Sequence, residues 1–379
     1  MNKKTFSVIL SIIISLVFII NDSFSKQFEC NMHNICFCEK NAIQYLSENK
    51  EEILNSAIEL SDEWNIDLSG KLDIAKPYYV YNFLNKQDTL LYFPVYSNEK
   101  ILFTISIMHS DKGYGWMVSP GYNDVLNKIE YLNNKVIVYA IDQYIYFESE
   151  NNTIALNNPD GKFKDTYLEE IKKNYEFFSK LDFIGKYNYY ENNKSNLSIV
   201  NTVSDINTIK NSKYGTGVSI TLIKPRGQHN HEMCWAASVA TIVNHLKNNM
   251  NLTAYDVCNA MNIGYDAGAS IYDVSSALTH YNVSYNHMYL DLLPWSKIKK
   301  CINNNKPFAI GGMNESVGYG HEVVGRGYAG SKDSTRKVSL WNPSYNNGNG
   351  SYVFMSYSSC TFDSGGSVVF NWTSTISYY

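Results

Sequence analysis

The chain of 379 residues is long enough for two ordinary domains, each with a sizeable hydrophobic core. Its formal net charge is −4 and no long basic run occurs, which argues against a nucleic-acid partner, because binding phosphates requires clustered lysine and arginine. Seven cysteines are too few for a disulfide scaffold, and their odd number leaves at least one thiol unpaired within the chain.

Residues 1–25 have the order of a secretory signal peptide. Lys3 and Lys4 precede an almost unbroken apolar run over residues 6–20, and residues 23–25, Ser-Phe-Ser, place small side chains where a cleavage site needs them. A single membrane anchor is the alternative, but the apolar run is short for a bilayer span of ~20 residues. We therefore expect a secreted protein with no stable membrane association after cleavage.

The sequence pattern of residues 26–184 predicts a helix, a strand-rich block and a second helix. Apolar residues at mixed spacings of three and four indicate amphipathic helices over residues 40–65 and 165–184. Between them, short runs rich in β-branched and aromatic residues predict strands at residues 76–84, 89–97, 100–108, 135–142 and 144–149. The second and third runs, and the fourth and fifth, look like hairpins. We expect a curved, half-barrel-like antiparallel sheet with a helix against it.

Composition changes sharply at residues 185–216, which are polar, rich in asparagine and weakly periodic. We interpret this segment as an exposed linker that is open to proteolysis. Residues 217–379 then have the size of a single domain. The apolar spacing predicts helices at residues 234–246, 270–281 and 295–303, followed by strands at residues 308–314, 321–328, 337–343, 350–357 and 367–372. Helices first and sheet last is an α+β order.

Cys234 stands at the predicted start of the first of these helices. A helix N-terminus stabilises a thiolate through its free N–H groups and dipole, which would make the thiol a nucleophile. A buried structural cysteine is the more common role for a thiol on a helix, and Cys234 alone does not decide between the two.

Three polar residues support the nucleophile. Gln228 lies in the loop before Cys234, where its amide could donate to a developing oxyanion together with the backbone N–H of Cys234. His321 stands at the start of a strand, where it can face a cleft. Asn342 ends the next strand, and antiparallel neighbours would bring its carbonyl close to His321, so that it could orient the imidazole.

These residues carry a resemblance to a known family. The run Q-x5-C-W-A-A-S, followed by GHEVVGRGY and then WNP, resembles the papain superfamily of cysteine peptidases over about residues 217–379. The short interval from cysteine to histidine and the strand-rich region before it look most like the secreted bacterial staphopain and streptopain types.

The resemblance implies a peptidase that is made as an inactive precursor and hydrolyses protein or peptide substrates. Cys234 would be the nucleophile, His321 the general base and acid, Asn342 the residue that orients the imidazole, and Gln228 the oxyanion donor. Residues 26–184 would be a propeptide that inhibits the enzyme intramolecularly until the linker is cut.

The sequence departs from the family pattern in two places. The usual Asn-Ser-Trp order is absent, so the tryptophan that shields the histidine–asparagine hydrogen bond is unassigned, and Trp372 is a candidate for it. The segment His229–Met233 matches no familiar loop of the family.

Other functions remain open. His229 and His231 suggest a metal site near Cys234, but neither His231 nor His321 begins a complete H-E-x-x-H motif, so we expect no metal and no cofactor. Cys30, Cys36 and Cys38 also lack a partner group at zinc-finger spacing. The same triad could serve an acyltransferase, a transglutaminase or an amidase, because water or an amine can resolve a thioester. A non-enzymatic secreted binding protein is the third possibility.

Overall fold

The computed structural model describes residues 41–156 and 217–378, apart from residues 69, 76, 79, 83–88, 111, 133–135, 142–143, 150–152, 230, 316–317 and 365–367. The predicted signal peptide, the helix at residues 165–184 and the linker at residues 185–216 lie outside the described residues. The chain divides into two compact units, Met1–Tyr45 and Leu46–Tyr379. The second unit has mixed helices and sheet of the α+β class.

The N-terminal part of this unit follows the predicted pattern closely. The predicted first helix is confirmed, and it spans residues 41–64. The elements that follow it are β1 (Asp73–Ile74), β2 (Val80–Asn82), β3 (Thr89–Ser97), β4 (Lys100–Ser110), β5 (Gly113–Ser119), α2 (Asn123–Lys128), β6 (Ile137–Ile141), β7 (Tyr144–Glu148) and β8 (Thr153–Leu156). The β3–β4 hairpin turns at Asn98 and Glu99, which both have a positive φ, as the two-residue turns that suit a twisted hairpin require.

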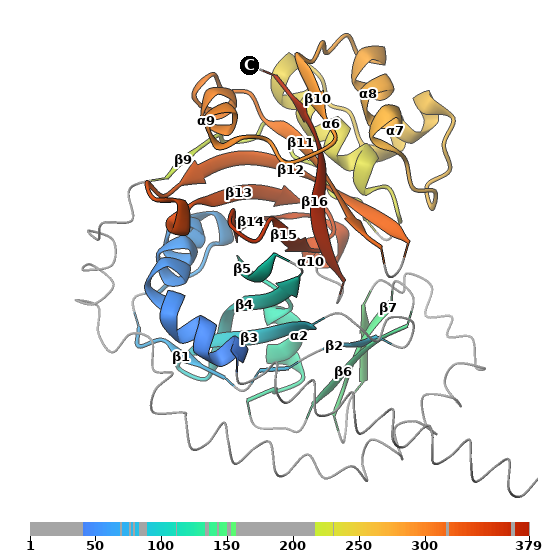
Figure 1. Ribbon diagram of the computed structural model, residues 1–379. Helices are drawn as coiled ribbons and strands as arrows, with labels where there is room; N and C mark the ends of the chain where they lie inside the picture. Colours follow the sequence, from blue (N-terminus) through green and yellow to red (C-terminus); the bar gives the residue numbers. More distant parts are fainter. Residues whose placement is uncertain are drawn as a thin grey trace, which may run out of the picture. The chain divides into compact units, whose positions relative to one another are not determined.

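The C-terminal part begins with helices and ends with strands, as predicted. Its elements are β9 (Val218–Ser219), α6 (Cys234–Lys247), α7 (Ala254–Met261), α8 (Ile271–His280), β10 (His287–Tyr289), α9 (Trp295–Asn303), β11 (Phe308–Asn314), β12 (Tyr319–Ala329), η2 (Asp333–Thr335), β13 (Lys337–Asn342), α10 (Tyr345–Gly348), β14 (Ser351–Ser356), β15 (Thr361–Asp363) and β16 (Val369–Ser377). Helices α6, α7 and α8 pack together, and α6 also contacts β11 and β12 (Figure 1). Within the described residues, no helix has both the length and the apolar character to cross a bilayer.

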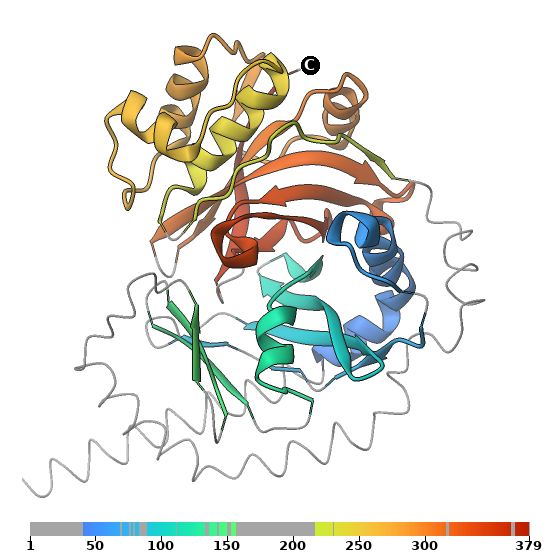
Figure 2. The same cartoon turned by 180° about the vertical axis from the view of Figure 1, so that it is seen from behind.

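One large sheet joins the two parts. Its strands run in the order β1-β3-β4-β5-β14-β13-β12-β11-β16-β10, with β9 paired to β12 and β15 paired to β16 (Figures 1 and 2). The junction is antiparallel, with Phe354 opposite Val118 and Met355 opposite Met117. A second sheet has the order β2-β6-β7-β8. The strands β1, β3, β4 and β5 therefore extend the sheet of residues 217–378, whereas β2, β6, β7 and β8 form a sheet of their own. The prediction of one antiparallel N-terminal sheet is wrong, since β2 also pairs with β6 in parallel.

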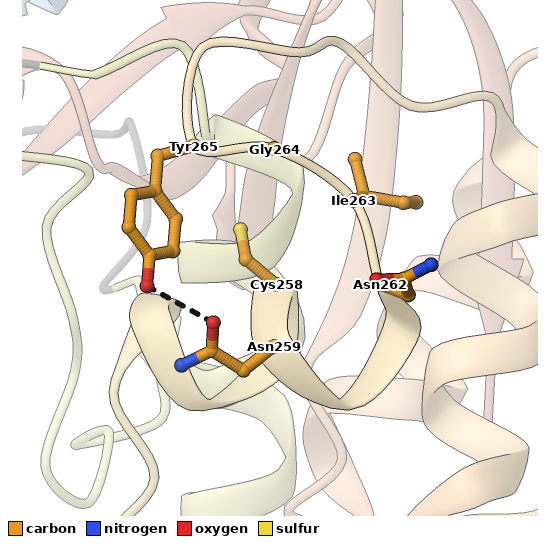
Figure 3. Close-up of a pocket in the computed structure, with 6 residues that line it drawn as sticks. All are labelled: Cys258, Asn259, Asn262, Ile263, Gly264 and Tyr265. Carbon is orange, nitrogen blue, oxygen red and sulfur yellow. Dashed lines mark hydrogen bonds between the residues drawn. The ribbon is translucent and has the colours of Figure 1, made fainter.

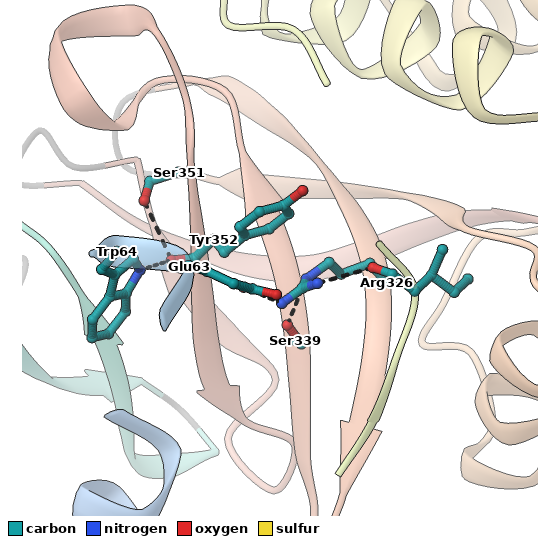
Figure 4. A network of polar contacts seen from close by, with 7 residues as sticks. Glu63, Trp64, Arg326, Ser339, Ser351 and Tyr352 are labelled. Atoms are coloured by element: carbon teal, nitrogen blue, oxygen red, sulfur yellow. Dashed lines mark hydrogen bonds and ion pairs between the residues drawn. The ribbon is translucent and has the colours of Figure 1, made fainter. Parts of the chain in front are cut away.

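A buried arginine binds the N-terminal helix to this sheet. Arg326 is 1% exposed, and it donates to the Ser339 hydroxyl at 3.0 Å and to the carbonyl oxygen of Ile220 at 2.9 Å. Its remaining terminal nitrogen pairs with the carboxylate of Glu63, and its guanidinium lies 3.9 Å from the ring centre of Tyr352 (Figure 4). The guanidinium thus has hydrogen-bond acceptors and a counterion around its edge and a ring against its face. A buried charge requires such partners.

Lys337 makes a second buried contact with the same helix. Its ammonium donates to the Ser56 hydroxyl at 2.8 Å and pairs with Glu59 at 3.1 Å. Burial lowers the pKa of Lys337 and raises the pKa of Glu59, whereas attraction between the two charges acts in the opposite direction on each. Burial also raises the pKa of Glu52 to about 7. Arg326 and Lys337, the two buried cations described in the C-terminal part, thus have their counterions on the N-terminal helix.

Candidate active site

Cys234 is the first residue of α6. The N-cap, Met233, provides no side-chain hydrogen bond, so the first N–H groups of this 14-residue helix are not capped by a side chain. Small residues follow, and they let the helix lie close to β12, where the Ser238 hydroxyl donates to the carbonyl oxygen of Glu322 at 3.2 Å. The Cys234 thiol is half-buried and forms no disulfide with another cysteine of the described residues.

His321 and Asn342 meet across the neighbouring strands β12 and β13. His321 Nε2 lies 2.8 Å from Asn342 Oδ1, as the sequence led us to expect. The amide nitrogen of Asn342 donates to the carbonyl oxygen of Asp363 at 2.8 Å, and this bond fixes which end of the amide faces the imidazole. In the neutral imidazole Nε2 therefore carries the proton, and Nδ1 is left as the basic nitrogen.

The thiol lies beside the strand that carries the histidine. Burial raises the pKa of Cys234 to about 12, while hydrogen bonds from the backbone of Glu322 and of Trp235 act in the opposite direction. Since Glu322 directly follows His321, the sulfur is adjacent to the imidazole's own segment of β12. Burial also lowers the pKa of His321 to about 4, against the effect of its bond to Asn342. The resting pair is therefore a neutral thiol and a neutral imidazole.

Gln228 is fixed to the same end of the site. Its backbone N–H donates to the carbonyl oxygen of Pro343 at 3.1 Å, next to Asn342, and its side-chain nitrogen donates to the carbonyl oxygen of His231 at 3.0 Å. One hydrogen of that NH₂ group remains for another acceptor. The loop approaches α10 closely at Gly227, where a Cβ would lie 2.0 Å from the carbonyl oxygen of Gly348.

Ser344 also belongs to the site, although it was not predicted from the sequence. Its hydroxyl lies 2.8 Å from Asn342 Oδ1 and 3.4 Å from His321 Nε2, and it also bonds to the carbonyl oxygen of Ser364. The sequence signal for Ser344 was its position. It is a short side chain two positions after the predicted asparagine, directly after a proline in a turn.

Two phenylalanines flank the histidine instead of the expected tryptophan. The ring centres of Phe370 and Phe362 lie 5.5 Å and 6.2 Å from that of His321. Trp372 is buried and stacks against Phe308 with the ring centres 6.2 Å apart. The aromatic rings beside the imidazole are therefore those of two phenylalanines, and Trp372, the candidate that the sequence offered, is not among the rings described in contact with it.

The two histidines before Cys234 belong to a cluster of aromatic rings. The ring of His229 stacks on that of Tyr255 with the ring centres 5.6 Å apart. The ring of His231 lies edge-on to Tyr255 and tilted to Tyr265, with ring centres 5.8 Å and 5.7 Å apart. His231 Nδ1 also lies 2.8 Å from a carboxylate oxygen of Asp266. These contacts hold His229 and His231 against α7, which carries Tyr255, and against the loop between α7 and α8, which carries Tyr265 and Asp266.

A small hollow opens next to Tyr265, one of the rings of this cluster. Cys258, Asn259 and Tyr265 contribute to its lining, and the Tyr265 hydroxyl donates to Asn259 Oδ1 at 2.9 Å (Figure 3). Burial raises the pKa of Cys258 to about 11, and no imidazole is among the described residues that line this hollow. The hollow therefore does not reproduce the arrangement at Cys234.

Comparison with models of known protein families and with characterised proteins finds no match to this sequence.

Proposed function

We propose that the chain is a secreted cysteine endopeptidase with a papain-like catalytic region at residues 217–379. The observation that carries this proposal is the fixed His321–Asn342 pair beside an α6 N-terminus that begins with Cys234. This combination supplies a nucleophile, a base with a defined tautomer, and a group that orients the base. A purely structural cysteine requires neither of the other two.

The proposed reaction proceeds through a thioester. His321 Nδ1 takes the thiol proton as Cys234 Sγ attacks the peptide carbonyl carbon, and the carbonyl π-bond electrons move to oxygen. The backbone N–H of Cys234 and the side-chain N–H of Gln228 stabilise the oxyanion. The imidazolium then protonates the departing amine. Water, deprotonated by the same nitrogen, attacks the thioester, and Cys234 leaves as the regenerated thiol.

We further propose that the chain is a latent precursor, with residues 26–184 as its propeptide. The N-terminal helix supplies the counterions for Arg326 and Lys337, as expected of a segment that must stay bound until it is removed.

A digest of a peptide library, with and without a thiol-directed inhibitor and with an added amine, tests the proposed reaction. Inhibitor-sensitive appearance of new N-termini supports a peptidase. Transfer of peptide to the amine without hydrolysis would favour the acyltransferase alternative. A library that stays intact after the linker has been cut would favour a binding protein.

Latency predicts that Cys234 reacts slowly in the uncut chain. With the pKa of its thiol near 12, alkylation by iodoacetamide at neutral pH should be about 10³-fold slower than for free cysteine. Cleavage between about Val200 and Val218 should accelerate it, and sequencing the new N-terminus locates the cut. Equal alkylation rates before and after the cut would contradict the latency.

Replacement of Gln228 by alanine should lower kcat by about 10²–10³-fold with little change in KM, because the oxyanion exists only along the reaction path. The matched control is His231→Ala, which keeps the main-chain carbonyl that accepts from Gln228. Steady-state kinetics of both variants decide the point, and an unaltered kcat for Gln228→Ala would remove this residue from the site.

A further inference from the structure

Glu322 is a buried carboxyl group that the proposed reaction does not use. It directly follows His321 on β12 and is only 7% exposed. Its Oε1 atom is buried and makes no hydrogen bond among the described residues. Burial of an ionised carboxylate without a partner is costly, so the neutral acid is the favoured form.

The neighbouring strand leaves room for this side chain. Gly311 on β11 lies opposite Glu322, and a Cβ there would be 3.0 Å from Glu322 Oε2 and 2.3 Å from Ser374 Oγ. The register with β16 also shifts between Gly311 and Gly312. Irregularities of this kind are frequent beside active sites, where they redirect a side chain.

The same residue acts on the nucleophile through a backbone hydrogen bond and through the charge of its carboxyl group. The backbone of Glu322 hydrogen-bonds to the Cys234 sulfur and lowers the pKa of the thiol, whereas the carboxylate raises it. Glu232, just before α6, raises it as well, with a smaller effect. From the side of β16, the titratable neighbour is Tyr378, whose pKa is raised mainly by burial and further by Glu322.

We propose that Glu322 is a positioning residue for Cys234, neutral during catalysis, whose loss of a proton opposes thiolate formation and sets the alkaline limit of the reaction. This role rests on the proposed function of Cys234. Burial raises the pKa of Glu322 to about 8, so the acid is mostly neutral at pH 7 and becomes charged in mildly alkaline solution. A negative charge beside the sulfur then makes the thiolate harder to form.

The test measures alkylation of Cys234 by iodoacetamide in the full chain as a function of pH, with mass spectrometry of the Cys234 peptide as the readout. Glu322→Gln should match the wild type near pH 6.5 and react about three- to tenfold faster near pH 9.5, since half to one pKa unit of repulsion is removed. Glu322→Asp, which keeps a carboxyl group, should have the same pH profile of alkylation as the wild type. Glu315→Gln, an exposed carboxyl between β11 and β12, is the matched control and should change nothing.

The wild-type chain provides a check that does not depend on the variants folding. Its alkylation rate should rise less than tenfold per pH unit between about pH 7 and pH 9, because Glu322 ionises in this range. A straight tenfold rise, or a variant-to-wild-type ratio that is constant with pH, would overturn the role of Glu322. Alkylation needs no peptide substrate. A chain that hydrolyses nothing would therefore refute the proposed function, while the pH profile of alkylation would still decide whether Glu322 acts on Cys234.

Discussion

Cys234→Ala is expected to lower kcat for peptide hydrolysis by about 10⁵–10⁶-fold, the size of effect that follows removal of a triad nucleophile. The fold should survive, because the change from thiol to methyl is small and the side chain is half-buried at a helix terminus. Hydrolysis is measured on the cut, active form, and the circular dichroism and melting temperature of both proteins are compared.

Cys258→Ala is the matched control for this variant. It removes a fully buried thiol from the neighbouring helix α7, and the rate of hydrolysis should stay close to that of the wild type. A Cys234→Ala protein that hydrolyses peptides at a substantial fraction of the wild-type rate would show that another group carries the reaction.

Lys337→Met is expected to destabilise the uncut chain by about 3 kcal/mol near pH 8 and by less than about 1 kcal/mol near pH 5. The variant leaves the carboxyl groups of Glu59 and Glu52 facing an apolar side chain instead of an ammonium. Because the attraction of Lys337 is lost, the pKa values of both carboxyls should rise further above the ordinary value of 4.5.

The sign of the pH dependence follows from this direction. A carboxyl whose pKa is higher in the folded chain than in the unfolded chain is bound to its proton more tightly when folded, so stability falls as pH rises through that range. The deficit of Lys337→Met should therefore be small when both carboxyls are protonated and large when they are charged. Urea unfolding at the two pH values measures it.

Lys299→Met is the matched control for the buried lysine. Lys299 is exposed on α9, so its replacement should shift the urea midpoint little at either pH. An equal loss of stability for Lys337→Met at pH 5 and pH 8 would contradict the proposed role of the Glu59 and Glu52 charges. In that case lost packing of the lysine stem would explain the effect.

Elements with a strong local pattern could be predicted from the sequence. The bounds of β3, β11 and α9 agree with the prediction, because alternation or helical spacing extends over their whole length. Helix α7 was missed since it is short, although Thr253 and Asp256 form a capping box that marks its start. Strand β5 was missed because Gly113 and Gly115 interrupt its apolar pattern.

Pairing between distant segments could not be predicted. The junction of β5 and β14 places Val118 opposite Phe354, and no local periodicity specifies such a partner. The need for a glycine at position 115 becomes visible only in the fold, because a Cβ of Gly115 would lie 2.0 Å from Ser359 Oγ. The strand order therefore shows that β1, β3, β4 and β5 extend the C-terminal sheet, where the sequence predicted one separate antiparallel sheet before a linker.

The candidate site was predictable to the extent that it follows strand neighbours. His321 and Asn342 lie on consecutive antiparallel strands, so their proximity follows from the strand prediction. The groups that fix Asn342, the Asp363 carbonyl and the Ser344 hydroxyl, depend on how the chain returns after β13 and β15. Phe370 beside the imidazole likewise depends on the pairing of β16, which sequence spacing does not provide.

The most direct test of the central proposal is labelling of the cut chain with an epoxide that traps low-pKa thiols, followed by mass spectrometry and a hydrolysis assay on the same samples. We predict one label per chain, on Cys234, with hydrolysis lost in proportion to labelling, and a large loss of labelling rate in His321→Ala. Labelling of Cys258, Cys301 or Cys360 at a comparable rate, or labelling of Cys234 that is indifferent to His321, would contradict it.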